Sequence, residues 1–283
     1  MTFSIVAADP SAGDWGVAVA SKFPAVGAVV PWARAGAGAV ATQAHADVSF
    51  GPRGLDLMAE GVPAGEALQR LVTDDADRGQ RQIGAVDPSG RAATFTGDRC
   101  LDWAGGLGGE HHACQGNILT GEDVVAAMDA AFRSTEGDLV DRLLAALLAG
   151  DGAGGDRRGR QSAALLVVRA AAGYGGGSDR YVDLRVDDHR RAAEELARVF
   201  EVFDREILIR NDPVLDPSAE LVADLQRRLS RLGRYEGAAS GEYDAATRAA
   251  IEGFAGEYNL EGKLREDDRI FESLVREIRD VTP

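Results

Sequence analysis

The order of strand-like and helix-like segments is the feature that most restricts the fold of this chain. Runs of β-branched and small apolar residues come first, at 2–9 and 15–23; helical patterns follow, and strand patterns return at 160–170 and 179–188. Strands and helices do not alternate, which argues against parallel βαβ units. We therefore predict an α+β fold with mostly antiparallel sheets, and the number of elements fits a four-layer αββα sandwich.

The remaining elements follow from the period of the apolar residues and from turn signals. Three glycine-rich pieces, at 105–109, 150–155 and 173–177, are predicted to be loops, and none has the spacing of a phosphate-binding loop. Further strands are expected at 25–33, 38–46, 81–87, 91–97 and 112–117, and helices at 51–60, 63–73, 121–134, 137–149 and 189–208.

The first two strands are predicted to form a hairpin, because the residues PSAGD between them combine Pro, Gly and Asp. A turn centred near residue 12 would place Thr2 opposite Lys22, on the same face of the sheet. The Lys22 ammonium would then lower the pKa of a free α-amino group at Thr2. A register that differs by one residue would send Lys22 to the other face.

The segment NDPVLDPSAE at 211–220, with its prolines and acidic residues, marks a domain boundary. We predict one domain at 1–210 and a second at 218–283. The second domain shows three helical patterns, the first of them N-capped by Ser218 and ending at Gly233. Three helices in about 70 residues can form a small core of their own.

Composition and charge exclude several functional classes. The formal net charge is −15 and both predicted domains are acidic, so neither nucleic acid nor an anionic membrane is an expected partner. Cys100 and Cys114 are too few for a disulfide scaffold, and no secretion signal or apolar span is recognisable, so we expect a cytoplasmic protein. Neither metal-ligand spacing of the histidines nor a GxSxG motif occurs, so we expect no metal and no cofactor.

Lysine is rare in this chain. Of the 31 basic residues only Lys22 and Lys263 are lysines. Arginine cannot deprotonate or act as a compact point charge, so these two positions stand out chemically against the arginine background.

Several long motifs follow one another in the first domain, namely TFSIVAADPSAGDWGVAVASKF, FGPRGLDLMAEG, CLDWAG, QGNIL, GGDRRGRQSAALLVV and SDRYVDLRVDDH. In this order they resemble the bacterial domain-of-unknown-function family 1028, over about residues 1–205. The family is placed by fold among the N-terminal-nucleophile (Ntn) hydrolases. That placement implies an αββα sandwich with a Thr, Ser or Cys at the mature N-terminus.

An Ntn hydrolase needs an N-terminal nucleophile, its own amine as base, oxyanion donors and a group that tunes the amine. Removal of Met1 would leave Thr2 as nucleophile and base. Lys22 is the candidate tuning group and Asn117 the candidate oxyanion donor, although a turn Asn is an equally good interpretation. The loop GGDRRGRQSA supplies Asp156 and Ser162 to orient the amine and Arg157, Arg158, Arg160 and Gln161 to bind a substrate carboxylate, although half of these arginines are expected to be merely solvated.

The second domain is similar to the peptidoglycan-binding-like three-helix domain. The matching positions are core and turn residues, which support the fold more than a ligand; they are Leu225, Gln226, Leu229, Leu232, Gly233, Tyr235, Gly241, Tyr243, Thr247, Ala250 and Phe254. A protein without a secretion signal would not meet the cell wall. Peptidoglycan is therefore a possible partner that we do not favour, and we expect a packing module in a homo-oligomer.

Two functional hypotheses follow. The first is an Ntn amidohydrolase that acts on a small amide or peptide-like substrate through Thr2. The alternative is a catalytically silent protein of the same fold, which binds a metabolite or a partner and uses the helical tail for interaction.

Overall fold

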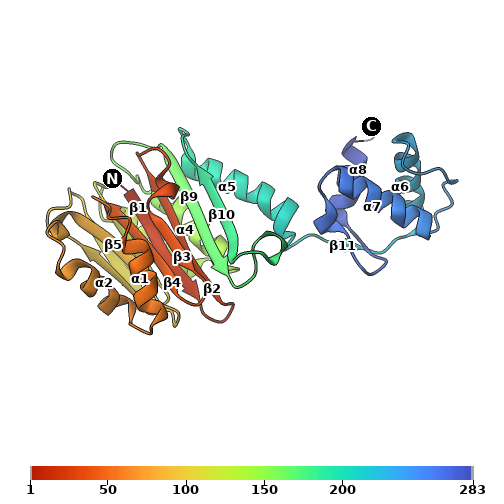
Figure 1. Ribbon diagram of the computed structural model, residues 1–283. Coiled ribbons are helices and arrows are strands. Elements are labelled where there is room, and N and C mark those ends of the chain that lie inside the picture. The colour runs from red at the N-terminus through yellow and green to blue at the C-terminus, as the bar shows by residue number, and fades with distance from the viewer. Residues whose placement is uncertain (1, 282–283) are drawn as a thin grey trace. The chain divides into compact units, whose positions relative to one another are not determined.

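The computed structural model describes residues 2–281, and the chain divides into two compact units, one up to Val199 and one from Phe200 (Figure 1). The helix α5 (Ala192–Phe203) spans this division and continues into a π-helical turn at Asp204–Leu208. Residues 200–210, which the predicted boundaries place in the first domain, group with the second unit.

Two antiparallel sheets form the centre of the first unit (Figure 1). The strand order is β10-β9-β2-β1-β8-β7 in the six-stranded sheet and β3-β4-β5-β6 in the four-stranded sheet. The six-stranded sheet contains β1 (Thr2–Asp9), β2 (Asp14–Ser21), β7 (Gly105–Gly109), β8 (His112–Asn117), β9 (Ser162–Arg169) and β10 (Arg180–Val186); the four-stranded sheet contains β3 (Pro31–Arg34), β4 (Gly38–Ala44), β5 (Arg81–Val86) and β6 (Ala92–Thr96).

Helices cover the outer faces of both sheets, so the first unit is the αββα sandwich that the sequence predicts. The four-stranded sheet packs against α1 (Phe50–Ala59) and α2 (Ala64–Thr73), and the six-stranded sheet against α3 (Asp123–Ser134) and α4 (Leu139–Gly152). Buried apolar side chains such as those of Val17 and Ala41 fill much of the space between the sheets. Their removal from water is the main force that holds the two sheets together.

The β1–β2 hairpin forms where it is predicted, but in a different register. Phe3 pairs with Ala20, which brings Ser21 and not Lys22 opposite Thr2. The cause is the chemistry of the turn: Asp9 Oδ1 accepts hydrogen bonds from the backbone N–H groups of Ser11 (3.0 Å) and Ala12 (3.2 Å). This Asx-type turn closes the hairpin between Asp9 and its partner Asp14 and shifts every pair by one position.

Two further sequence predictions are corrected by the structure. Residues 105–109 form an edge strand rather than a loop, because β7 pairs along β8. Glycine suits this strand: a Cβ on Gly109 would lie 2.2 Å from the ring of His112, and one on Gly106 would lie 2.7 Å from Thr94. The expected strand at 25–33 is instead a 3-10 turn at Val26–Ala28 followed by the short β3.

The second unit contains the three predicted helices, α6 (Ala219–Arg231), α7 (Ala245–Glu257) and α8 (Glu272–Val281), and a two-residue ladder between β11 (Val214–Leu215) and β12 (Ile270–Phe271). Its core includes Leu225, Phe254 and Ile278, each fully buried. As predicted, Ser218 caps α6, with its hydroxyl oxygen accepting from the N–H of Leu221 at 3.2 Å.

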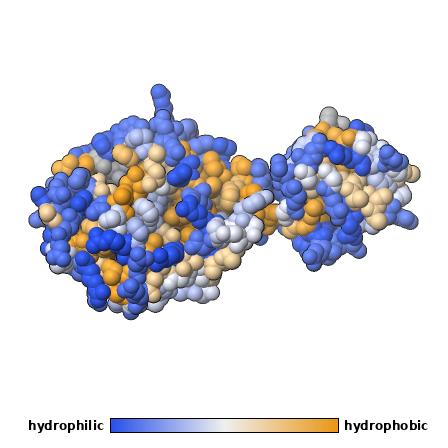
Figure 2. Space-filling view, viewed as in Figure 1, coloured by the Kyte–Doolittle hydropathy of each residue, from blue (hydrophilic) through white to orange (hydrophobic). Residues whose placement is uncertain are grey.

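The surface agrees with the acidic, polar composition. None of the helices in residues 2–281 is long and apolar enough to cross a bilayer. On the face shown in Figure 2, hydrophilic residues are interspersed with smaller apolar areas.

Lys263, one of the two lysines, is buried in the second unit. Lys263 is 1% exposed, and its Nζ has no hydrogen-bond partner among residues 2–281. Burial lowers the pKa of Lys263, and the negative charges of Glu277, Asp212 and Glu206 partly oppose that effect. A buried ammonium without a direct partner is unfavourable, so the charged form of Lys263 destabilises this unit.

We predict that Lys263→Met raises the free energy of unfolding at pH 7 by about 1–2 kcal/mol, since Met keeps the length and removes the buried charge. The folded-state pKa of Lys263 lies below its ordinary value of 10.5. Wild-type stability should therefore rise as pH increases through the interval between the two pKa values, and the variant should lack this rise.

Urea unfolding of the full chain at pH 7 and at alkaline pH checks both statements. Lys22→Met is the matched control, because Lys22 is the other lysine and is exposed. A destabilised Lys263→Met, or an equal gain in both variants, would contradict the assignment of a buried charge.

We also predict that residues 1–210 fold without the rest of the chain, because both sheets and the helices α1 to α4 that cover them lie upstream of this boundary. The truncated protein should show a cooperative thermal transition by circular dichroism. Loss of that transition would mean that residues after 210 complete the core of the first unit.

Candidate functional site

A row of polar side chains crosses the six-stranded sheet where β1 begins. Thr2 pairs with Asn117 of β8, the β1–β2 register puts Ser21 on its other side, and Ser21 pairs with Ser162 of β9. Residues directly opposite one another share a face of a sheet. The row Asn117–Thr2–Ser21–Ser162 therefore spans four neighbouring strands, and all four residues are buried.

Ser21 is the member of this row that the sequence prediction missed. Its Oγ lies 3.1 Å from Thr2 Oγ1, within hydrogen-bond distance. Lys22, which was predicted to occupy the position opposite Thr2, follows the end of β2 and is exposed. Its part in tuning the amine remains a hypothesis that rests on charge near Thr2 and no longer on direct pairing.

Asp156 joins two loops beside this row. The residue is 6% exposed, and its carboxylate accepts from the backbone N–H of Lys22 at 2.7 Å and from that of Arg158 at 2.8 Å. A β-bridge pairs Asp156 with Leu119, two residues beyond the end of β8. These bonds fix the chain segment that follows Ser21 next to the loop at Arg158.

Ser162 and Gln161 hold the segment after β2. The Ser162 hydroxyl donates to the carbonyl oxygen of Phe23 and accepts from the N–H of Val26 at 3.1 Å. The side-chain amide of Gln161 donates to Asp188 at 3.2 Å, and the backbone N–H of Gln161 donates to the carbonyl oxygen of Ser21. Ser162 thus belongs to the row, Gln161 lies next to it, and both support its geometry.

The three predicted arginines differ in their partners. Arg160 Nε bonds to both carboxylate oxygens of Asp151, at 2.7 and 2.8 Å, and Arg158 pairs with Asp156 at 3.4 Å. The exposed side chain of Arg157 has no acidic partner within residues 2–281. Of the three, Arg157 is therefore the one whose guanidinium is available to a substrate carboxylate.

Asn117 is held by amide side chains from the opposite sheet. Gln82 Oε1 accepts from Asn117 Nδ2 at 2.8 Å and from Gln43 Nε2 at 2.9 Å. Gln82 Nε2 in turn donates to Thr96 Oγ1 at 2.9 Å and to the carbonyl oxygen of Gly116 at 2.7 Å. Because Gln82 is fully buried and its amide is bonded at both ends, the orientation of Asn117 is set by this network.

The same network continues along the interface between the sheets. Ser4 Oγ donates to Gln43 Oε1 at 2.6 Å, and Gln115 Nε2 donates to Ser4 Oγ at 2.7 Å. Gly84 leaves room for this contact, because a Cβ there would lie 2.2 Å from Gln115 Oε1. We call Ser4, Gln43, Gln82, Gln115 and Asn117 the amide layer. A sequence pattern does not predict this layer, because its glutamines lie on different strands and only the stacking of the two sheets brings them together.

Other groups with reactive chemistry lie outside this site. His112 Nε2 is 2.8 Å from Asp129 Oδ1 of α3, and the ring packs against Phe132 at 4.5 Å between centroids. Cys114 is fully buried, and burial raises the pKa of its thiol well above the ordinary value. Both are core residues at the contact of the six-stranded sheet with the helices.

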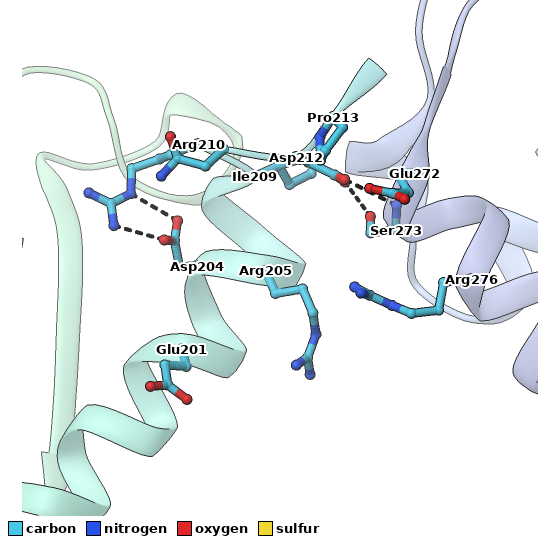
Figure 3. Close-up of a pocket in the computed structure, with 11 residues that line it drawn as sticks. Glu201, Asp204, Arg205, Ile209, Arg210, Asp212, Pro213, Glu272, Ser273 and Arg276 are labelled. Atoms are coloured by element: carbon cyan, nitrogen blue, oxygen red, sulfur yellow. Dashed lines mark hydrogen bonds and ion pairs between the residues drawn. The ribbon is translucent and has the colours of Figure 1, made fainter. Parts of the chain in front are cut away.

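A cavity of about 310 Å³ lies within the second unit (Figure 3). Arg210 forms an ion pair with Asp204 at 2.8 Å, and Asp212 accepts from the backbone N–H of Ser273 at 3.0 Å, at the start of α8. These bonds hold the turn that leads into the helical unit. The cavity contains none of the residues predicted for the site.

Comparison with known proteins finds a family model that matches each of the two units. The model "Family of unknown function (DUF1028)" matches residues 2–196, and the model "Putative peptidoglycan binding domain" matches residues 212–277. No curated protein matches the chain.

A solved structure supports the first assignment. The crystal structure of protein SPO2555 from Silicibacter pomeroyi, a member of the same family, is 32% identical in sequence, with a TM-score of 0.65 over 72% of this chain and 89% of that one. With a family model that covers more than half of its residues, this chain belongs to the DUF1028 family, whose function is unknown.

Proposed function

We propose that this protein is an Ntn-type amidohydrolase that cleaves a small amide or peptide-like substrate through Thr2. The observation that supports it best is the row Asn117–Thr2–Ser21–Ser162 at the start of β1. It puts three hydroxyl groups and one amide donor side by side where the first residue after Met1 begins a central strand.

In this proposal, removal of Met1 frees the α-amino group of Thr2, and the small side chain of Thr permits that removal by the usual aminopeptidase. Thr2 Oγ1 attacks the carbonyl carbon of the amide while the amine takes the hydroxyl proton. The tetrahedral intermediate then expels the amine product, which leaves with that proton, and an ester to Thr2 remains. Water attacks the ester and releases the carboxylic acid.

Asn117 is our candidate for stabilising the oxyanion. Its Nδ2 carries two hydrogens, and Gln82 Oε1 accepts one of them. The second hydrogen is available for the negative oxygen of the intermediate. A donor held in place by buried neighbours needs little reorganisation during the reaction, which is the condition for effective oxyanion stabilisation.

Ser21 and Lys22 are the candidates that adjust the nucleophile. The Ser21 hydroxyl, 3.1 Å away, can orient Thr2 Oγ1. The exposed ammonium of Lys22, next in sequence, would favour the neutral form of the amine through its charge. Asp156 would support both by holding the N–H of Lys22.

The second unit has two candidate roles. Its match to a peptidoglycan-binding model supports binding of a cell-wall fragment. We favour a packing role in a homo-oligomer, because most of the apolar residues that carry the resemblance lie in the core of the unit and not on its surface. Sedimentation of the full chain and of residues 1–210 would separate them. A change in oligomeric state supports the packing role, whereas pelleting with insoluble peptidoglycan supports the cell-wall role.

We predict that a β-lactone adds one mass equivalent at Thr2 and that Thr2→Ala abolishes the addition, because the only proposed nucleophile is gone. Thr2→Ser should still react, since it keeps a hydroxyl beside the amine. Loss of the hydrogen bond to Ser21 should cost about 1 kcal/mol of stability in Thr2→Ala, too little to unfold the chain. Intact mass and peptide mapping measure labelling, and thermal unfolding measures stability.

Intact mass also decides between the two functional hypotheses. Quantitative retention of Met1, or labelling of Thr2→Ala to the wild-type level, would exclude the hydrolase mechanism and leave the silent, ligand-binding alternative.

We predict that Lys22→Met shifts the pH midpoint of Thr2 labelling upward by less than about one unit. The cation disfavours protonation of the amine, so its removal raises the pKa of the amine. The shift is limited because an exposed charge is screened by water and salt. Lys22→Arg should leave the midpoint close to that of the wild type, because it keeps the positive charge. A midpoint that stays constant or moves downward in Lys22→Met would remove Lys22 from the site.

A further inference from the structure

We propose that the cavity where β5 starts and β6 ends binds a carboxylate, and that this carboxylate belongs to a substrate of the protein. The cavity has a volume of about 560 Å³, and Arg78, Thr96, Asp98 and Arg99 line it. The assignment of the carboxylate to a substrate rests on the proposed function, whereas the binding itself does not.

The basic side chains of the first unit are mostly neutralised. Arg34 pairs with Asp56, Arg81 with Asp75 and Arg169 with Asp14, for example. Within residues 2–199, the basic side chains for which the described structure holds no acidic partner, side-chain hydrogen bond or ring contact are those of Lys22, Arg78, Arg99, Arg157, Arg185 and Arg190. Two of these line one cavity, in a chain whose net charge is −15.

The wall of this cavity is built from two loops that are fastened together. The N–H of Arg99 donates to the carbonyl oxygen of Gly79 at 2.7 Å, and the N–H of Gly97 donates to that of Arg81 at 2.8 Å. Gly79 has no side chain that would displace these groups, because a Cβ there would lie 2.6 Å from both Arg99 Nε and Asp98 Oδ1. The backbone thus makes room for the guanidinium of Arg99 and for the carboxylate of Asp98.

The charges of the cavity favour an anion. Arg78 and Arg99 contribute two positive charges and Asp98 one negative charge, so the lining carries +1. Guanidinium groups present planar pairs of N–H donors that match the two oxygens of a carboxylate. Asp98 opposes binding, so its neutralisation should strengthen the site.

The amide layer connects this cavity to the candidate nucleophile. Thr96 lines the cavity and accepts from Gln82, and Gln82 accepts from Asn117, which pairs with Thr2. One sheet spacing and two strand spacings, β5–β6 and β1–β8, separate the two places, a distance on the order of 15 Å. The link between the two places is therefore a chain of buried side chains, those of Gln82 and Asn117.

Isothermal titration of the full chain with glutarate and with its uncharged diamide, glutaramide, tests the site. We expect glutarate to bind and glutaramide to fail. Arg78→Gln with Arg99→Gln should weaken glutarate binding at least tenfold, and Asp98→Asn should tighten it. Inorganic phosphate at the same concentration should bind more weakly than glutarate if the site selects carboxylates; tighter phosphate binding would overturn the carboxylate assignment.

Arg185→Gln with Arg190→Gln is the matched control. It removes the same charge from side chains that also have no partner in the described structure. Arg185 lies on β10, an edge strand of the other sheet, and lines a different cavity with Arg180 and Asp183, so this control also tests whether any arginine-lined cavity binds glutarate. Glutarate binding should be unchanged in this control. Equal losses in both double variants, or equal binding of glutarate and glutaramide, would overturn the proposed site.

Glutarate binding to Thr2→Ala, compared with β-lactone labelling of the wild type, separates this proposal from the function on which it rests. Glutarate should bind Thr2→Ala as it binds wild type. If that holds while β-lactone labelling of Thr2 fails, the carboxylate site stands and the hydrolase proposal falls. If Thr2 is labelled but glutarate does not bind, the hydrolase proposal stands and the carboxylate site falls.

Discussion

The hydrogen bonds around the Gln82 side chain are the interaction on which the arrangement at the start of β1 depends. Most of the space between the two sheets is apolar, yet at this end an uncharged amide accepts from Asn117 and Gln43 and donates to Thr96. A buried amide that lost one of these partners would cost about 1–3 kcal/mol. The two sheets are therefore held in one relative position here by directional bonds, which apolar packing alone would not enforce.

This directionality explains why the fold was easier to predict than the site. The order of strands and helices, the sandwich and the three-helix tail follow from apolar period and turn residues, which are local. Asp9 shows the limit of local patterns: they predict the turn, but the hydrogen bonds that Asp9 accepts from Ser11 and Ala12 shift the register by one residue. The sequence pattern therefore predicts Lys22 opposite Thr2, where the structure has Ser21.

The site depends even more on contacts that are remote in sequence. Residue type and family resemblance predict Thr2, Asn117 and Ser162 as site residues. Pairing of β1, β2, β8 and β9 then places them in one row with Ser21. Gln43 and Gln82 carry no local signal, because a buried Gln in a strand looks like any polar residue of an alternating pattern. Only the stacking of the sheets shows that they face Asn117.

The scarcity of lysine has a practical consequence for handling the molecule. Amine-directed reagents find two side chains in this sequence, and burial protects one of them, Lys263. Coupling to an activated surface, a fluorophore or a cross-linker at the side chain of a lysine would therefore concentrate on Lys22, one residue from Ser21. A preparation immobilised in this way would present the molecule with the start of β1 turned toward the support. A tag added to the second unit would avoid coupling through Lys22.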